Sequence, residues 1–227
     1  MYRIYPAKIL VAALVWLALG INLLFVHAQD LVSFRSGPGT VATAVWLLLN
    51  LLFWGPIWRR VWKRIPALER AVFPDLNGTW DVELTSNWSR QEQMLEAAAR
   101  NTPKIDMRIC DEQLLAPLRT VHLRAEITQT LWKFEMKLHS PSAATPIKRS
   151  DTLIVEPERG VGLKPPTISY FYKQENNTAN VADDPEFYGA ARLHYDFETR
   201  TLEGLSWTAR KWQRAINTAA SLRMTRI

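Results

Sequence analysis

The sequence predicts two N-terminal transmembrane α-helices followed by an all-β domain, an antiparallel β-barrel of about eight strands with one short helix after the first strand. Two observations lead to this fold class. The first 64 residues contain two membrane-length apolar runs, and the residues after Pro74 alternate between apolar and polar side chains in short segments separated by turns. Such alternation is typical of half-buried strands, and a series of short strands is typical of a β-sandwich or a barrel.

The two apolar runs cover residues 9–26 and 41–57, and neither contains a charged side chain. A bilayer core of about 30 Å needs roughly 17–25 apolar residues in a helix, and the backbone in lipid must satisfy its own hydrogen bonds. A cleaved signal peptide ending near Ala28 is the alternative for the first run, but the second run argues against it. We therefore expect a transmembrane hairpin at 1–64, a linker at 65–76 and a cytoplasmic β-barrel sensor domain at 77–227.

The positive charge lies almost entirely beside the apolar runs. The formal net charge is +6, and residues 1–64 carry seven Lys or Arg and one acidic residue, whereas residues 65–227 carry 21 of each sign. Lys and Arg are enriched in cytoplasmic flanks of membrane helices. We therefore expect a multi-pass protein of the bacterial inner membrane with both termini and the barrel in the cytoplasm. Because the barrel is neutral, we expect no DNA or RNA binding.

Each apolar run contains one asparagine, Asn22 in the first and Asn50 in the second. A polar side chain in lipid is costly unless it finds a hydrogen-bond partner, and interhelical pairing is the usual solution. We predict membrane-helix contacts at both positions, with contact at Asn50 favoured because it lies deeper in its run. The alternative for Asn22 is a hydrated position near the outer interface.

The segments with a strand pattern are about eight or nine in number. They cover residues 80–85, 105–109, 121–127, 132–138, 149–156, 167–174, 187–197, 202–209 and 219–226. A helix is expected after the first strand, because Ser89 and Glu92 have the spacing of a capping box. We favour a closed barrel over a sandwich, since closure leaves no exposed strand edge. An eight-stranded barrel is just wide enough to be filled by side chains or to hold one small ligand.

No catalytic motif occurs in the sequence. There is no glycine-rich phosphate loop, no nucleophile elbow and no zinc-protease motif. Cys110 is the only cysteine and the four histidines are scattered, so no metal-ligand spacing is present. We therefore expect a receptor or effector, not an enzyme, with no metal and no cofactor.

Aromatic and basic residues near the predicted strand ends are candidates for ligand binding. Flat aromatic rings stack on bases at about 1–3 kcal/mol per base. Arginine pairs with phosphate through its planar fork. A cyclic dinucleotide offers both features, although each aromatic side chain could instead belong to the barrel core. The predicted ligand-binding residues are Trp88, Tyr170, Tyr172, Tyr188, Trp207, Thr208 and Arg210.

The order of several short motifs resembles one known family. The motifs are Leu76-x-Gly78-x-Trp80, Ser86-x-Trp88, Ile127-x-Gln129, Tyr170-x-Tyr172, Leu202-x-Gly204-x-x-Trp207-Thr208-x-Arg210 and the terminal segment 221–226. Together with the two apolar runs, this order resembles the CD-NTase-associated two-transmembrane β-barrel effectors of CBASS anti-phage defence (the SMODS-associating two-transmembrane β-strand-rich family). The sequence departs from that pattern at Phe187-Tyr188-Gly189, where His-x-Gly is expected, and at Ser206-Trp207, where a tyrosine leads the pair.

The resemblance implies a function. In that family a CD-NTase partner makes a cyclic nucleotide, the barrel binds it, the protein self-associates, and the helices disrupt inner-membrane lipid in an abortive infection. Two alternatives remain open. A membrane-tethered lipocalin-like carrier would have an apolar cavity, and a structural anchor would have a filled barrel, whereas a nucleotide receptor would have a polar opening around Arg210.

Overall fold

The computed structural model describes residues 7–29, 37–53, 55–100, 105–130, 133–142, 145, 147–177 and 184–227. The chain divides into two compact units, one comprising Met1–Asp75 with Gln129–Lys133, and the other comprising Leu76–Thr128 with Phe134–Ile227.

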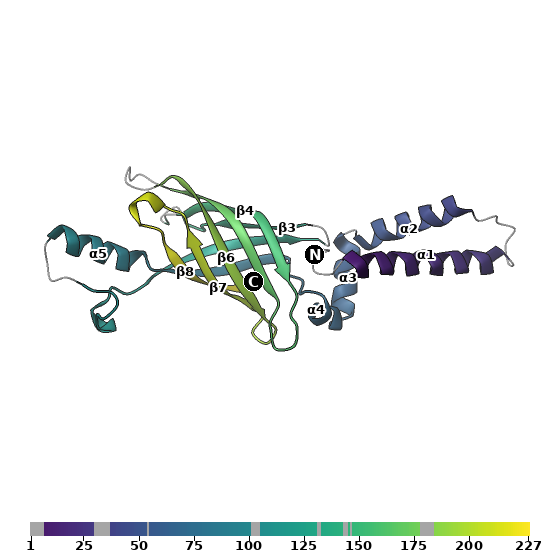
Figure 1. The fold of residues 1–227 in the computed structure, drawn as a ribbon, viewed down its shortest axis with the longest axis horizontal. Helices are drawn as coiled ribbons and strands as arrows, with labels where there is room; N and C mark the ends of the chain where they lie inside the picture. The colour runs from purple at the N-terminus through teal and green to yellow at the C-terminus, as the bar shows by residue number, and fades with distance from the viewer. Residues whose placement is uncertain are drawn as a thin grey trace. The chain divides into compact units, whose positions relative to one another are not determined.

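The described elements follow one another as four helices and then the barrel (Figure 1). The helices of the first unit are α1 (Ala7–Gln29), α2 (Pro38–Phe53), α3 (Gly55–Arg64) and α4 (Ala67–Ala71). The strands are β1 (Gly78–Ser86), β2 (Arg119–Gln129), β3 (Phe134–His139), β4 (Ile147–Glu158), β5 (Thr167–Asn176), β6 (Glu186–Asp196), β7 (Thr201–Thr208) and β8 (Ala219–Arg226). Between them lie α5 (Trp88–Arg100) and two short 3₁₀ helices, η2 (Glu112–Leu114) and η3 (Trp212–Arg214).

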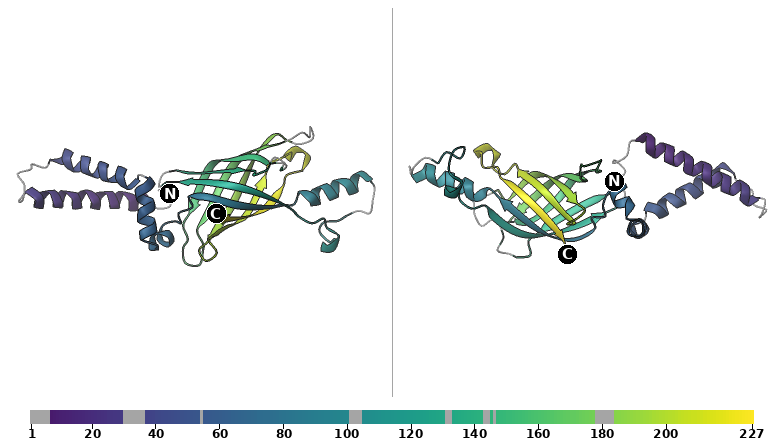
Figure 2. Two further views of the ribbon diagram at one scale, coloured as in Figure 1. Left: turned by 180° about the vertical axis from the view of Figure 1, so that it is seen from behind. Right: turned by 90° about the horizontal axis from the view of Figure 1, so that it is seen from below.

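The eight strands form a closed barrel in which each strand pairs with its neighbours in sequence and β1 pairs with β8. The pairings along β1, and along β4 to β8, are antiparallel. This confirms the expected barrel of eight antiparallel strands and the helix after the first strand. That helix, α5, leaves the barrel from the end at which β1 ends and β2 begins, and extends beyond the strands (Figure 2). We call this end of the barrel the α5 end.

A ninth strand at residues 105–109 is not present, and its expectation was wrong. The segment forms a turn in which the carboxylate of Asp106 accepts hydrogen bonds from the backbone N–H of Arg108 at 3.0 Å and from its guanidinium at 3.0 and 2.7 Å. Aspartate competes with sheet pairing in this way because its short side chain reaches nearby backbone groups. Ile109 is 83% exposed, so the apolar alternation here has no core to face.

The barrel interior is filled at the end opposite α5. Trp80, Leu193 and Met224 alternate with exposed neighbours along their strands, and these three residues and Leu202 are fully buried there. Gly204 allows β7 to approach β6 closely, because a Cβ at this position would lie 2.0 Å from the backbone oxygen of Arg192. Dense packing here leaves the α5 end as the part of the barrel with room for a ligand.

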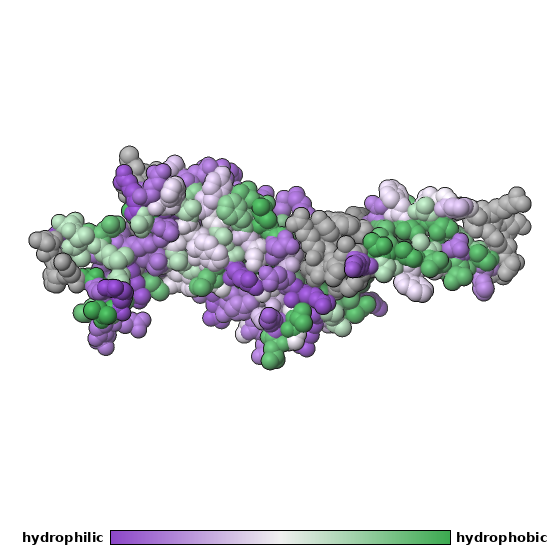
Figure 3. Space-filling view, viewed as in Figure 1, coloured by the Kyte–Doolittle hydropathy of each residue, from purple (hydrophilic) through white to green (hydrophobic). Residues whose placement is uncertain are grey.

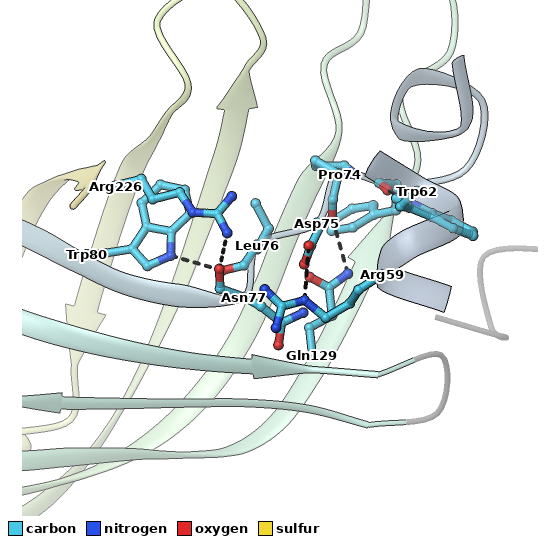
Figure 4. A network of polar contacts seen from close by, with 10 residues as sticks. Arg59, Trp62, Pro74, Asp75, Leu76, Asn77, Trp80, Gln129 and Arg226 are labelled. Atoms are coloured by element: carbon cyan, nitrogen blue, oxygen red, sulfur yellow. Dashed lines mark hydrogen bonds and ion pairs between the residues drawn. The ribbon is translucent and has the colours of Figure 1, made fainter. Parts of the chain in front are cut away.

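The segment before β1 is held by side-chain hydrogen bonds to its carbonyl groups (Figure 4). In the barrel unit, the Leu76 carbonyl accepts from Trp80 Nε1 at 2.9 Å, and the Asn77 carbonyl accepts from the guanidinium of Arg226. In the other unit, Trp62 Nε1 donates to the Phe73 carbonyl at 2.9 Å. Further contacts there join Arg59 to Asp75 at 3.4 Å and Gln129 Nε2 to the Pro74 carbonyl at 3.1 Å. These bonds give a structural role to Trp80 and Gln129, two of the residues in the sequence motifs.

The expected pair of transmembrane helices is contradicted by the structure. Helices α1 and α2 form and contact each other, and many of their apolar side chains are exposed, as the green surface of this region shows (Figure 3). However, none of the described helices has both the length and the apolar character needed to cross a membrane. The second apolar run illustrates the difference, because α2 has 16 residues, about 24 Å at 1.5 Å per residue, which is short of a bilayer core of about 30 Å. The multi-pass inner-membrane localisation, which rested on these spans, is overturned with them.

The two asparagines of the apolar runs are exposed. Asn50 donates its side-chain N–H to the carbonyl of Trp46 at 2.8 Å, one turn earlier in α2. This hydrogen bond lies within α2, and the predicted contact of Asn50 with another helix stays a prediction. The predicted contacts of Asn22 stay untested.

Candidate functional site

A cavity of about 480 Å³ opens at the α5 end of the barrel. This volume lies within the range of about 300–1,000 Å³ that is common for ligand pockets. Its wall is built from inward-facing residues of most strands, from the first turns of α5 and from the β7–β8 connection, all within the barrel unit. Apolar side chains form much of this wall, including Leu84, Val121, Ile147 and Phe187.

Among the described residues that line the cavity, four carry a cationic side chain and Glu92 alone carries a carboxylate. The cations, which we call the rim cations, are Arg119, Arg210, Lys211 and Arg214. Among the described residues, the side chains of Arg119, Lys211 and Arg214 make no ion pair. By contrast, the outward-facing Arg192 pairs with Glu158 at 3.0 Å. Unpaired cations around an opening raise the local concentration of anions and favour an anionic ligand.

Arg210 and Trp88 form a cation–π pair that joins the two segments flanking the cavity. The guanidinium carbon of Arg210 lies 4.2 Å from the centroid of the Trp88 ring. The indole N–H of Trp88 donates to Glu92 at 2.7 Å, which fixes the plane of the ring on α5. The pair therefore presents an oriented aromatic face and a guanidinium side by side at the cavity.

The β7–β8 connection holds its rim cations in a constrained backbone. Lys211 has φ +43° and Ala215 has φ +55°, which are left-handed conformations that residues with a Cβ seldom adopt. The carboxylate of Asp184 accepts from the backbone N–H of Lys211 at 2.7 Å, and Arg214 N–H donates to the Lys211 carbonyl at 2.9 Å. Strained backbone conformations of this kind are common at ligand-binding sites, where the surrounding hydrogen bonds hold them in place.

Tyr172 forms part of the cavity floor and depends on a glycine in the neighbouring strand. Tyr172 pairs with Gly189 in the β5–β6 ladder, and a Cβ at residue 189 would lie 2.4 Å from the ring carbon Cζ and 2.4 Å from the hydroxyl oxygen of Tyr172. Ser206 on β7 also interacts with the hydroxyl group. Burial raises the pKa of Tyr172 to about 12, although the interaction with Ser206 acts in the opposite direction. The floor is therefore neutral at physiological pH.

Gln174 lies between the floor and the rim on the same face of β5 as Tyr172. Its residue exposure is 7%, and its Nε2 donates to Asn176 Oδ1 at 2.9 Å. Both Gln174 and Asn176 line the cavity. A smaller space continues beneath the floor, lined by Ser150, Tyr170 and other interior residues.

The predicted ligand-binding residues separate into three groups. Trp88, Tyr172, Thr208 and Arg210 line the cavity. Tyr170 points inward but lies in the smaller space beneath the floor, where burial raises the pKa of its hydroxyl group. Tyr188 and Trp207 do not line the cavity, because they alternate with the inward-facing Phe187, Ser206 and Thr208 and so face outward.

The outward-facing Trp207 belongs to an apolar row across five strands, which we call the outer row. Its members are paired directly across the ladders and are Ile154, Phe171, Ala190, Trp207 and Ala219. Ile154 is 61% exposed, Phe171 39% and Trp207 51%. The ring of Tyr188 stacks on Phe171, with centroids 5.5 Å apart and planes at 8°.

Gln174 and the rim cations Arg119, Lys211 and Arg214 line the cavity and were not among the predicted ligand-binding residues. A signal for Gln174 was present, because it continues the inward alternation of Tyr170 and Tyr172. Arg119, Lys211 and Arg214 gave no such signal, because they come from the start of β2 and from a connection whose conformation is set by tertiary contacts. The described residues contain no group of three or more His, Cys, Asp or Glu side chains placed to hold a metal ion.

Comparison with known proteins identifies one informative relative. The chain is similar to CD-NTase-associated protein 15 of Escherichia albertii, with 22% identity over 227 residues, which is 100% of this chain and 98% of that protein. No family model matches the chain. The full-length similarity supports the association with CD-NTases that the motifs implied, whereas assignment to the two-transmembrane effector subfamily is not confirmed by it.

Proposed function

We propose that the barrel is a receptor for a cyclic nucleotide, most simply a cyclic dinucleotide, bound in the cavity at the α5 end. The observation that carries the proposal is the rim of cations around an open cavity, with an oriented aromatic face at Trp88. Cationic groups suit the phosphates of such a ligand, and aromatic faces stack on its bases. The protein acts by binding, without catalysis and without a metal or organic cofactor.

The relative named as CD-NTase-associated supports a CBASS-linked role for this chain. CD-NTases, by the resemblance stated above, supply the cyclic nucleotide. We therefore propose a CD-NTase as the functional partner and its product as the activating ligand. Membrane disruption is left out of the proposal, because the spanning helices on which it depended are not found in the described residues.

Denaturant unfolding of the full chain with a panel of cyclic di- and trinucleotides tests the receptor proposal. A ligand at about 100 times its dissociation constant should raise the free energy of unfolding by about 2.7 kcal/mol. Arg210→Met and Arg119→Met should each weaken binding by about tenfold or more, because a charge-assisted hydrogen bond contributes about 1.5–3 kcal/mol. Arg192→Met on the outer face is the matched control and should leave binding unchanged.

Two results would contradict the receptor proposal. One is that no member of the panel stabilises the folded protein. The other is that the outer-face control weakens binding as much as the two rim variants do.

A carrier of an apolar anion, such as a fatty acid, is the second candidate function. The apolar wall of the cavity favours it, since Leu84, Val121, Ile147 and Phe187 would contact an acyl chain well. The same unfolding assay with fatty acids separates the two functions. A carrier would be stabilised by long-chain fatty acids and by no cyclic nucleotide.

We also propose that the protein self-associates when its ligand binds. The outer row supports it, because exposed apolar rows bordered by ion pairs have the anatomy of protein interfaces. Here the borders are Lys173–Glu186 at 2.8 Å and Arg192–Glu158 at 3.0 Å. Each border is neutral, so two copies related by a two-fold axis can meet without like-charge repulsion. Light scattering with and without the activating ligand should show an increase in mass.

A further inference from the structure

The cavity changes from charged to neutral between its rim and its floor. The rim cations come from the ends of strands and from the β7–β8 connection, whereas the residues below them are Asn176, Gln174, Ser206 and Tyr172. A phosphate buried at the floor would lose its hydration without meeting a cation, which is costly. An uncharged ring that carries hydrogen-bond donors and acceptors could instead form hydrogen bonds with these polar side chains.

Gln174 has hydrogen-bonding capacity that the protein itself does not use. One N–H of its side-chain amide bonds to Asn176. Within the described part of the chain, the carbonyl oxygen of Gln174 accepts no hydrogen bond. This oxygen is not one of the buried side-chain atoms without a partner, so it faces the open space of the cavity, where it can accept a hydrogen bond from a ligand or from water. The free oxygen and the second N–H give one acceptor beside one donor.

We propose that a nucleobase of the ligand enters the barrel lumen while its phosphates stay at the rim, and that Gln174 determines which base is preferred. This inference rests on the proposed function. Gln bonds to a base edge through a neighbouring donor and acceptor, as in its pairing with adenine. Apolar residues at the same depth, among them Leu84, Val121 and Phe187, contact the faces of the base.

Gln174→Met and Gln174→Glu test the inference in the full chain, with dissociation constants measured by calorimetry for the four cyclic homodinucleotides of adenine, guanine, cytosine and uracil. Met has a similar length but cannot form the hydrogen bonds, so binding of the preferred ligand should weaken by about tenfold to a hundredfold. The differences in affinity among the four ligands should become smaller in the same variant. Glu accepts but does not donate, so it should shift the ranking towards guanine, whose edge carries two adjacent N–H donors.

Two comparisons separate a base contact from a change in the rim or the fold. Inorganic pyrophosphate has no base, so Gln174→Met should leave its binding unchanged, whereas Arg210→Met should weaken it. Gln113→Met, the same substitution at an exposed residue of η2 outside the cavity, should leave all five affinities unchanged.

Different results overturn the inference and the proposed function. If the parent protein binds a cyclic dinucleotide but Gln174→Met lowers all four affinities equally, or lowers none, the base-reading role is wrong and the receptor function stands. If the parent protein binds none of the four cyclic dinucleotides, the receptor proposal fails for this ligand class and the inference fails with it.

Discussion

Replacing Gly189 by alanine should destabilise the barrel, because the new Cβ would overlap the Tyr172 side chain. The added atom would lie 2.4 Å from Cζ, 2.4 Å from the hydroxyl oxygen and 2.8 Å from Cε2 of that ring. Overpacking of this kind costs about 1–3 kcal/mol. We therefore expect Gly189→Ala to lower the free energy of unfolding by about 1–3 kcal/mol.

Urea denaturation of the full chain, followed by tryptophan fluorescence, measures this loss. In thermal unfolding the same loss should lower Tm by about 2–4 °C for each kcal/mol, given the size of the chain. Tyr172→Leu removes the overlapping atoms, so Gly189→Ala should cost little in a Tyr172→Leu background. The two substitutions should therefore be coupled by about 2 kcal/mol in a double-mutant cycle.

Gly204→Ala is the matched control for this cycle. A Cβ at residue 204 would lie 2.0 Å from the backbone oxygen of Arg192, which no side-chain truncation relieves. Its cost should therefore be the same with Tyr172 or Leu at position 172. The steric account of Gly189 is refuted if Gly189→Ala unfolds at the parent midpoint, or if its cost persists in full beside Tyr172→Leu.

Three further predictions concern the cavity, the outer surface and pH. Arg210→Met and Trp88→Leu should be coupled by about 1 kcal/mol in a double-mutant cycle of folding stability, because the pair is half-buried and the guanidinium carbon lies 4.2 Å from the ring centroid. If the two losses of stability are strictly additive, the cation–π contact does not contribute. Trp207→Ser should reduce ligand-driven self-association in light scattering and leave the ligand affinity unchanged, and an unchanged mass would remove the outer row from the interface. The raised pKa of Tyr172, about 12 against about 10 when unfolded, stabilises the fold at every pH below 10. This contribution should be lost as pH rises from 10 to 12, at up to about 1.4 kcal/mol per pH unit, and Tyr172→Phe should show a smaller loss of stability over that interval.

The barrel could be predicted from local pattern because side chains alternate across a strand with a period of two residues. Eight of the nine expected strand segments, and the helix that begins near Ser89, correspond to elements of the structure, and only the segment at 105–109 failed. It failed because alternation shows what a segment could bury and not whether a partner strand is there. The same limit applies to the two apolar runs, whose composition indicated membrane spans that the described helices do not provide.

The sequence by itself determined the strand order, the inward face of each strand and the neutral charge of the barrel, because each depends on residues that are close along the chain. It also placed Trp88, Tyr172, Thr208 and Arg210 among the candidates that line the cavity. Only the tertiary structure decided that Tyr188 and Trp207 face outward and that Arg119, Lys211 and Arg214 surround one opening. Barrel closure pairs Ser86 with Ala220 and brings Arg119 to the same opening as Arg214, so the charge of the rim is a property of that closure and is not visible in any local stretch of sequence.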